Sequence, residues 1–333
     1  MLKVANFPQK DRSAIFRNTA QKCGMSEAIV EKDFWVCWVI NYLFHQSQWK
    51  GHLAFKGGTS LSKVYRLIER FSEDIDLILD WCILGYSIDE PWEKRSKTKQ
   101  DKFNKETDNR AAGFLKNEFL PQLFNDFSRM LAESFDLYID ETEPQTVCFA
   151  YPQIFEDFSI LKVIRLEIGA LAAWTPTQNL KMTSYAAEKY PKIFSDPYST
   201  VLTVAAERTF WEKITILHKE AFRTNGLVPE RYSRHYYDLY CMNSSDIKQN
   251  AYANLELLDR VVNFKARFYP TNAARYDLAK PETMKLVPPV DCIMALESDY
   301  AHMQNMIYGR KPKFSDIMNC IQLMEHEINN LKC

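Results

Sequence analysis

Alternation of apolar and polar residues predicts the strands of this chain. Ile75, Leu77 and Leu79 alternate with acidic positions, which predicts a strand with one core face and one acidic face. Residues 161–171 alternate in the same way, with Glu167 on the less apolar face. Further strands are predicted over the apolar stretches 52–55, 146–151 and 200–204.

Apolar residues at helical spacing predict the helices. Ser26 is placed to cap a helix that continues to Leu43, and its apolar residues cover so much of its surface that we expect burial. Thr59 is predicted to cap a second helix over 60–69. Further helical patterns cover 207–223, the residues from about 230, and most of the chain beyond 244.

This order of elements predicts an α/β (α+β) fold, with a mixed sheet flanked by helices and a mostly α-helical C-terminal half. We place an α/β domain at 1–198 and a mostly helical domain at 199–333. Within the first domain, a basic segment at about 82–112 is predicted to be an exposed insertion that becomes helical toward 109–131. Such a charged segment is usually a solvated face, and a nucleic-acid contact is the alternative.

Composition narrows the class of protein. The 42 Lys and Arg nearly balance the 43 Asp and Glu, which excludes a strongly basic nucleic-acid coat but leaves room for a local basic face. No apolar run approaches the roughly 18 residues of a membrane span, so we expect no membrane contact. The eight Cys include no C-x-x-C pair and are expected to be reduced thiols in a cytoplasmic protein.

An unusual glycine pair follows the strand predicted at 52–55. The chain has only 9 Gly, and two of them are adjacent in Lys56-Gly57-Gly58-Thr59-Ser60. Two glycines let backbone N–H groups approach an anion with no Cβ in the way, and the helix that follows directs its positive end to the same place. The sequence therefore predicts a phosphate-binding turn. The G-x-x-x-x-G-K pattern is missing, which disfavours a P-loop ATPase.

A pair of aspartates follows this turn. Asp74 and Asp76 lie two residues apart on a predicted strand and so share a face. Two adjacent carboxylates repel each other unless a divalent cation lies between them. A phosphate-binding turn that faces such a pair predicts metal-assisted phosphoryl or nucleotidyl transfer.

The glycine turn followed by Asp-x-Asp resembles the DNA polymerase β-like nucleotidyltransferase superfamily. More narrowly, the segment FKGGTSLSKVYRLIERFSEDIDL, with EKDFWV upstream and RTFWEKITILHKEA and RYSRHYYDLY downstream, is similar to the AbiEii/AbiGii nucleotidyltransferase toxins. These are bacterial enzymes of type IV toxin–antitoxin and phage-abortive systems. The matching blocks extend from Glu31 to Tyr240, and the downstream blocks distinguish this family from antibiotic nucleotidyltransferases.

The resemblance implies roles for individual residues. Gly58 and Ser60 match the pair that holds the nucleotide phosphates, and a third carboxylate is expected beside the aspartates. Glu167 fits its apolar–acid–apolar context, although the superfamily uses a shorter side chain; pairing with Arg165 is the alternative. The implied metal ligands are Asp74, Asp76 and Glu167, and the implied nucleotide site comprises Lys56, Gly57, Gly58, Thr59, Ser60 and Lys213.

The downstream blocks add two residues. Lys213 and Asp238 stand where the family places a functional Lys and a functional Asp. A Lys at a metal site neutralises charge on the triphosphate, and we expect Asp238 to orient Lys213, an Arg or the nucleotide. His235 is interpreted as a packing or hydrogen-bonding residue.

The implied reaction moves NMP from an NTP to an acceptor hydroxyl with two Mg²⁺ ions, or Mn²⁺ in their place. The resemblance implies an RNA acceptor, particularly the tRNA 3′ end, and a cognate antitoxin protein. The basic stretch 91–116 and the cluster Arg223, Arg231 and Arg234 are candidate RNA surfaces. Two alternatives stay open, namely transfer to a small-molecule or protein hydroxyl, and a nucleotide-binding module without catalysis.

Overall fold

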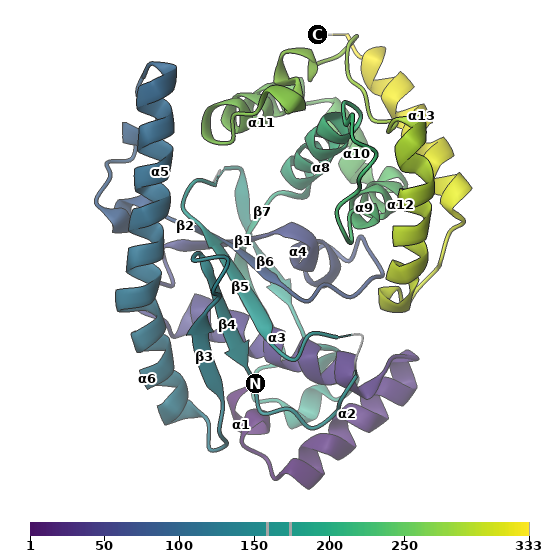
Figure 1. Cartoon of the computed structure of the whole chain (residues 1–333). Coiled ribbons are helices and arrows are strands. Elements are labelled where there is room, and N and C mark those ends of the chain that lie inside the picture. The colour runs from purple at the N-terminus through teal and green to yellow at the C-terminus, as the bar shows by residue number, and fades with distance from the viewer. Residues whose placement is uncertain (158–159, 173–174, 333) are drawn as a thin grey trace. The chain divides into compact units, whose positions relative to one another are not determined.

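The computed structural model describes residues 1–157, 160–172 and 175–332, which form two compact units (Figure 1). Unit 1 consists of Met1–Val64 and Phe71–Val204, and unit 2 consists of Tyr65–Arg70 and Ala205–Cys333. From the sequence, we predicted the boundary between the two domains after residue 198 and assigned residues 65–70 to the first domain. In the structure, the chain leaves unit 1 for six residues before it returns to form the strand Ile75–Leu79, which contains Asp76.

The described part of unit 1 is built on a mixed seven-stranded sheet of order β3-β4-β5-β2-β1-β7-β6. β1 pairs antiparallel with β2 and parallel with β7, and β2 pairs parallel with β5. The predicted α/β class is thereby confirmed. The strands are β1 Leu53–Lys56, β2 Ile75–Leu79, β3 Asp136–Ile139, β4 Thr146–Ala150, β5 Ile164–Gly169, β6 Thr177–Met182 and β7 Ser199–Val204.

The central strands are those that the alternation predicts. β5 alternates between buried and half-buried residues along its whole length, so Glu167 lies on the face opposite Leu166 and Ile168. The sequence missed β3 and β6, which are the two edges of the sheet. Edge strands expose many of their side chains, and these two carry no regular apolar alternation.

Helix α3 (Glu27–His45) is the buried helix that the sequence predicted, and Figure 1 shows it crossing the sheet. Ser26 caps it, because its Oγ accepts a hydrogen bond of 3.3 Å from the N–H of Ile29. Trp35 and Trp38 are almost fully buried and pack against Phe149 of β4. This aromatic cluster fixes α3 on the sheet.

The basic segment is more ordered than the sequence predicted. Helix α5 (Lys97–Phe114) begins twelve residues before position 109 and continues through a π-helical turn, Leu115–Phe119, into α6 (Leu120–Met130). Figure 1 shows α5 and α6 as one long column. The exposure predicted for this segment is seen on the face of α5 that carries the lysines, whereas the other face, with Phe103 and Phe114, is buried.

The helix after the glycine pair is shorter and starts earlier than predicted. α4 covers Gly57–Lys63, with Lys56 rather than Thr59 at its N-cap. α4 ends at Lys63, Arg66 adopts a positive φ of 54°, and residues 65–70 belong to unit 2. The apolar spacing through Ile68 reflects burial in that second unit.

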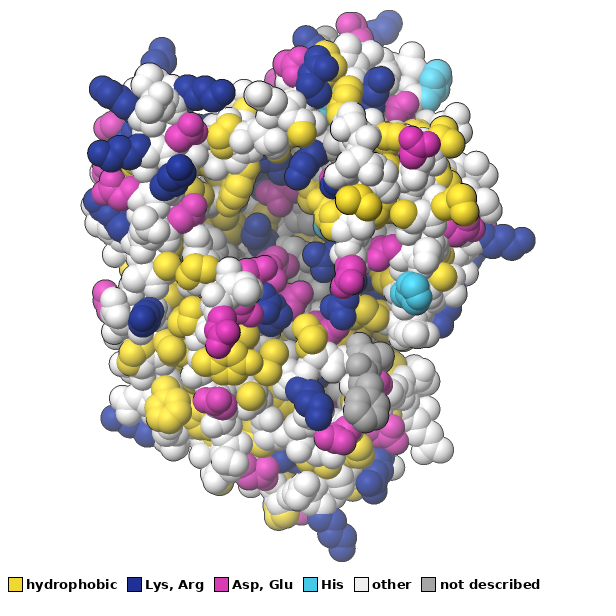
Figure 2. Space-filling view, in the orientation of Figure 1, with side chains coloured by type: hydrophobic (Ala, Val, Ile, Leu, Met, Phe, Trp, Pro, Cys, Tyr) yellow, Lys and Arg dark blue, Asp and Glu magenta, His cyan; other side chains and the backbone are white. Residues whose placement is uncertain are grey.

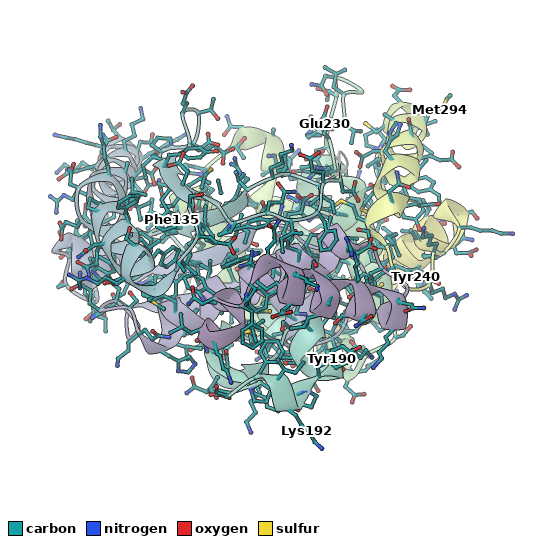
Figure 3. The ribbon with its side chains drawn as sticks, turned by 90° about the horizontal axis from the view of Figure 1, so that it is seen from below. Phe135, Tyr190, Lys192, Glu230, Tyr240 and Met294 are labelled. Atoms are coloured by element: carbon teal, nitrogen blue, oxygen red, sulfur yellow. The ribbon has the colours of Figure 1, made fainter. Side chains whose placement is uncertain are left out.

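Unit 2 is mostly helical, as the sequence predicted. Its segment 65–70 is held by a β-bridge between Arg70 and Ile307 and by a hydrogen bond of 3.0 Å from the N–H of Tyr308 to the carbonyl of Glu69. On α12, Met294 is 82% exposed and points away from the ribbon in Figure 3. The longer helices are α8 Ala206–Glu220, α9 Ser233–Asn243, α10 Asp246–Tyr252, α11 Leu255–Phe268, α12 Val290–Met303 and α13 Phe314–Asn329.

The remaining helices of unit 1 are α1 Leu2–Ala5, α2 Gln9–Cys23 and α7 Tyr185–Lys189. Among the described residues, no helix combines the length and apolar character that crossing a membrane would require. Seven of the eight cysteines are free thiols, and Cys333 lies outside the described residues.

Candidate active site

The glycine turn and the aspartate pair lie together in unit 1. In the antiparallel pair of β1 and β2, Lys56 is opposite Asp76. Gly57 follows with a φ of +78°, and a Cβ at this position would come within 1.8 Å of Oδ2 of Asp76. Only glycine leaves room for the carboxylate to lie against the turn. The proximity that the sequence predicted is confirmed by this contact.

Glu167 completes the group from the neighbouring strand. The parallel register of β2 and β5 places Asp76 directly opposite Glu167. Both side chains belong to the less buried face of their strands, and the side chain of Glu167 is 40% exposed. Asp74 lies one residue before β2, where Oγ1 of Thr59 donates a hydrogen bond of 2.5 Å to its carbonyl oxygen.

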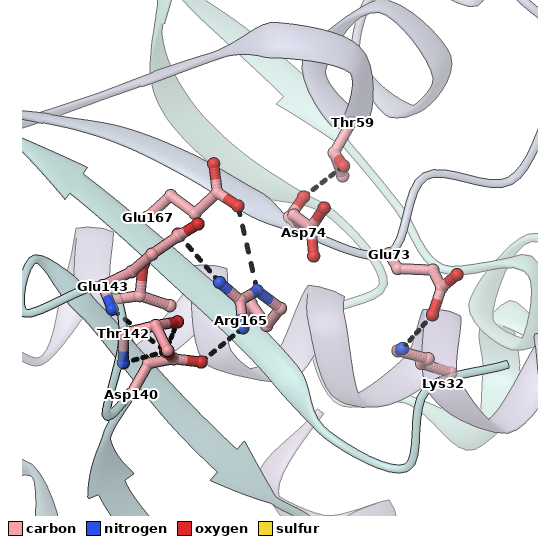
Figure 4. A network of polar contacts seen from close by, with 10 residues as sticks. Lys32, Thr59, Glu73, Asp74, Asp140, Thr142, Glu143, Arg165 and Glu167 are labelled. Atoms are coloured by element: carbon pink, nitrogen blue, oxygen red, sulfur yellow. Dashed lines mark hydrogen bonds and ion pairs between the residues drawn. The ribbon is translucent and has the colours of Figure 1, made fainter. Parts of the chain in front are cut away.

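The three carboxylates influence one another. Burial, followed by the negative charges of Asp76 and Asp74, raises the pKa of Glu167 to about 7. Arg165 offsets little of this charge, because it is paired with Asp140 at 2.6 Å and with Glu143 at 2.9 Å. Figure 4 shows this network, with a contact of 3.9 Å from Arg165 to Glu167. The predicted alternative, pairing of Glu167 with Arg165, is thus present only as this long contact, beside the shorter pairs of Arg165 with Asp140 and Glu143.

The donor set suits a hard divalent cation in its chemistry. Carboxylate oxygens are the preferred protein ligands of Mg²⁺ and Mn²⁺, and the raised pKa of Glu167 indicates negative charge that a cation would offset. As they stand, however, no three His, Cys, Asp or Glu side chains in the described segments are close enough together to hold a metal ion. These residues have the ligand atoms that a divalent cation prefers, but their carboxylates would have to move closer together to bind one.

The hydroxyl groups of the turn are used within unit 1. Oγ of Ser60 donates to the carbonyl of Gly57 at 2.8 Å, and Thr59 bonds to the Asp74 backbone. Both residues are buried, whereas Lys56, Gly57 and Gly58 are half-buried. Phosphate contacts from this turn would therefore involve residues 56–58, while Thr59 and Ser60 hold the shape of the turn.

A second cluster lies within unit 2. Nζ of Lys213 is 2.8 Å from Oδ2 of Asp238, as expected of a residue that orients the lysine. Arg70 holds both carboxylate oxygens, with Nε at 2.7 Å from Oδ1 and Nη2 at 2.8 Å from Oδ2. All three side chains are buried.

Within this cluster, the charge of each residue shifts the pKa of its neighbours. Burial alone would raise the pKa of Asp238, but the positive charges of Arg70 and Lys213 hold it well below its usual value. Burial and the charge of Arg70 lower the pKa of Lys213, against the opposing effect of Asp238. The structure therefore groups the sequence-predicted residues into one cluster in each unit.

Sequence reasoning missed Arg70, although it stands four residues before Asp74 in the matched block. The expectation that Asp238 orients a Lys or an Arg could have directed the search to an arginine such as Arg70. His235 behaves as the sequence suggested. Its Nδ1 is buried and has no hydrogen-bond partner among the described residues, and burial, followed by the charge of Lys213, holds its pKa well below its usual value.

Replacing Gly57 by Ala is expected to disable this turn. A methyl group would overlap Asp76, and the positive φ would be strained by about 1–3 kcal/mol. We expect nucleotide transfer to fall by roughly 10²-fold, the scale of a 1 Å displacement of catalytic groups. Transfer from labelled NTP measures the effect. Gly51→Ala is the matched control, since no atom lies within 4 Å of its added Cβ; equal activity of the two variants would refute the packing argument.

The pKa of Glu167 predicts a pH effect in metal-free protein. The folded pKa of about 7 exceeds the ordinary value of 4.5, so folded protein keeps a proton that unfolded protein releases between these values. The free energy of unfolding should therefore fall as pH rises from about 4.5 to 7, then level off. The variant Glu167→Gln has no titrating carboxyl group at this position, so its free energy of unfolding should lack this pH dependence. Urea unfolding in chelator should show the variant gaining stability over wild type across that range; a constant difference would contradict the raised pKa.

Two comparisons with known proteins, one with family models and one with solved structures, find similar proteins. The family model described as "Nucleotidyl transferase AbiEii toxin, Type IV TA system" matches residues 41–320, and a search of curated proteins finds no match. The solved structure of MenT4, a nucleotidyltransferase toxin from Mycobacterium tuberculosis, is similar over 95% of this chain and 97% of its own, at 16% identity and a TM-score of 0.45. Because the family match spans most of its length, this chain belongs to the AbiEii family of type IV toxin–antitoxin systems and is an NTP-dependent nucleotidyltransferase toxin.

Proposed function

We propose that this toxin transfers NMP from an NTP to a hydroxyl group of RNA in the cytoplasm, with the tRNA 3′ end as acceptor and Mg²⁺ or Mn²⁺ as cofactor. The observation that carries the proposal is the opposition of Asp76 and Glu167 across two parallel strands, with Asp76 against the Gly57 turn. This places a carboxylate pair beside a backbone that can approach phosphate.

Each residue of unit 1 has a proposed task. Asp74, Asp76 and Glu167 would hold two divalent ions, which would stabilise the attacking and leaving oxygens at the α-phosphate. The backbone of Gly57 and Gly58 and the side chain of Lys56 bind the triphosphate, supported by the half-buried position of all three. Service as the base for the acceptor hydroxyl is the alternative role of Glu167, in place of metal binding.

Lys213 is assigned the neutralisation of negative charge on the triphosphate. Support comes from its position in the matched family block and from its ion pair with Asp238. Asp238 and Arg70 act through Lys213 by fixing where its ammonium group lies. Burial lowers the pKa of Lys213, and the ion pair with Asp238 opposes this effect by favouring the charged ammonium group.

The RNA acceptor is supported by charge on α5. The lysines on the exposed face of this helix gather near its upper end in Figure 2. Its first turn contains no acidic residue, so Lys97 and Lys99 oppose the helix dipole and contribute nothing to helix stability there. A polyanion such as RNA would be attracted to this face. These exposed lysines are Lys97, Lys99, Lys102 and Lys105.

Incubation with α-labelled NTPs and total RNA, in the presence of Mg²⁺, tests the proposal. We expect label on tRNA from wild type and none from Asp76→Asn. Label that reaches only a small molecule or a protein would move the activity to another acceptor. No transfer to any acceptor would favour a nucleotide-binding module. Removal of divalent ions with chelator should stop the reaction, and transfer that persists would exclude metal dependence.

A further inference from the structure

Three consecutive charged residues of α3 are buried inside unit 1. Glu31, Lys32 and Asp33 are 0%, 0% and 1% exposed, within a helix that otherwise packs apolar side chains. Burying a charge is costly unless a partner and hydrogen bonds compensate for it. Each of the three has such partners, and each partner belongs to a different segment around the candidate site.

Lys32 joins the beginnings of the two strands that carry the opposed carboxylates. Its Nζ lies 2.7 Å from Oε2 of Glu73 and 2.8 Å from the carbonyl oxygen of Leu161, and the N–H of Leu161 donates to the same Glu73 oxygen at 2.9 Å. Glu73 directly precedes Asp74, and Leu161 lies three residues before β5. Figure 4 shows the Lys32–Glu73 pair beside Asp74.

Asp33 holds the end of the turn helix. Its Oδ1 lies 2.6 Å from Nζ of Lys63, and its Oδ2 accepts a hydrogen bond of 2.7 Å from the N–H of Tyr185. Lys63 is the last residue of α4, whose first residue is Gly57. Glu31 accepts hydrogen bonds from the N–H groups of residues 154 and 155, in the segment after β4.

We propose that the Lys32–Glu73 and Asp33–Lys63 ion pairs are positioning groups for nucleotide transfer. Lys32 fixes β2 against β5 at their common end, and so sets the register in which Asp76 faces Glu167. A shift of one residue in that register would turn Glu167 toward the core. Asp33 fixes α4 and with it the turn that Asp76 touches. The inference rests on the proposed catalytic roles of Asp76 and Glu167.

Fold stability alone does not explain these pairs. Apolar residues of similar volume usually stabilise a protein as well as a buried ion pair does, or better. What an ion pair adds is a requirement for one particular geometry. Two such pairs from adjacent positions of one helix reach both sides of the same small site. This points to control of geometry rather than to stability.

The decisive variant replaces one pair by apolar residues, Lys32→Met/Glu73→Leu. We expect its melting temperature to stay within a few degrees of wild type, while kcat for transfer falls by at least about 30-fold with little change in KM for NTP. Glu73→Gln keeps both hydrogen bonds and should retain kcat within about fivefold. The matched control is Arg12→Met/Glu133→Gln, which removes another ion pair of unit 1 that has a buried arginine; it should leave kcat unchanged.

The outcomes separate the hypotheses. Wild-type kcat in the folded double variant would overturn the positioning role, as would an equal loss of kcat in the Arg12 control. Should the double variant not fold, Asp33→Asn/Lys63→Met tests the same role, since its Asn still accepts a hydrogen bond from the N–H of Tyr185. If Asp76→Asn also transfers nucleotide normally, the proposed function itself fails; if only the pair variants are normal, the positioning role alone fails.

Discussion

Replacing Asp76 by Asn lowers nucleotide transfer by about 10²- to 10³-fold in a protein that keeps its fold, the largest effect that we expect on activity. Loss of one well-placed electrostatic group in an active site has this scale. Asn has the shape of Asp and fits against Gly57, so the turn keeps its geometry. The substitution also removes a like charge opposite Glu167, which should leave stability unchanged or slightly raised.

Transfer from α-labelled NTP and thermal unfolding together measure this prediction. Asp80→Asn is the matched control, because Asp80 follows the same strand but contacts His52 and caps a short helix over Trp81–Leu84. It should transfer nucleotide normally. Growth arrest on over-expression should disappear with Asp76→Asn and persist with Asp80→Asn. A folded Asp76→Asn protein with activity within tenfold of wild type would remove Asp76 from the mechanism.

Replacing Asp238 by Ala has the largest expected effect on stability. The change leaves Arg70 and Lys213 buried without their shared carboxylate. Breaking a buried ion pair from one side costs about 3–5 kcal/mol of unfolding free energy. Lys213→Met differs, because Asp238 keeps both contacts to Arg70; this variant should fold and lose transfer.

Urea unfolding of the purified protein checks the Asp238 prediction. Asp277→Ala is the control, because Asp277 forms an exposed ion pair with Arg275 in the same unit. This variant should unfold at the same urea concentration as wild type. An Asp238→Ala midpoint equal to that of the control would show that the cluster contributes no stability. Normal transfer by folded Lys213→Met would remove that lysine from the proposed mechanism.

The sequence identified those parts of the fold that have a local signal. β2 and β5 alternate because they are buried on one face and half-exposed on the other. The predicted helix over 60–69 extended too far, because Ile68 continues the apolar spacing although the chain turns at Arg66. Ile68 is buried, and residues 69 and 70 contact residues 307–310, a long-range contact that no local pattern encodes.

In the candidate site, too, residues in a local motif could be predicted from the sequence, whereas long-range pairings could not. Gly57, Asp74 and Asp76 were found from a short motif. The opposition of Asp76 and Glu167 depends on which strands are neighbours, and the pairing of Arg70 with Asp238 spans 168 positions. The buried charges of α3 did leave a signal, since three charged residues interrupt an otherwise apolar helix, but their partners could not be inferred without the structure.

The excursion of residues 65–70 into unit 2 has a consequence for how the toxin is synthesised. Arg70 leaves the ribosome 168 residues before Asp238, an interval of roughly ten to thirty seconds at ordinary rates of translation. Through that interval the guanidinium group has no native carboxylate to meet, and Lys213, which shares this carboxylate, is made only 25 residues before Asp238. A growing chain therefore cannot complete the cluster of Arg70, Lys213 and Asp238 until residue 238 of its 333 residues has been made.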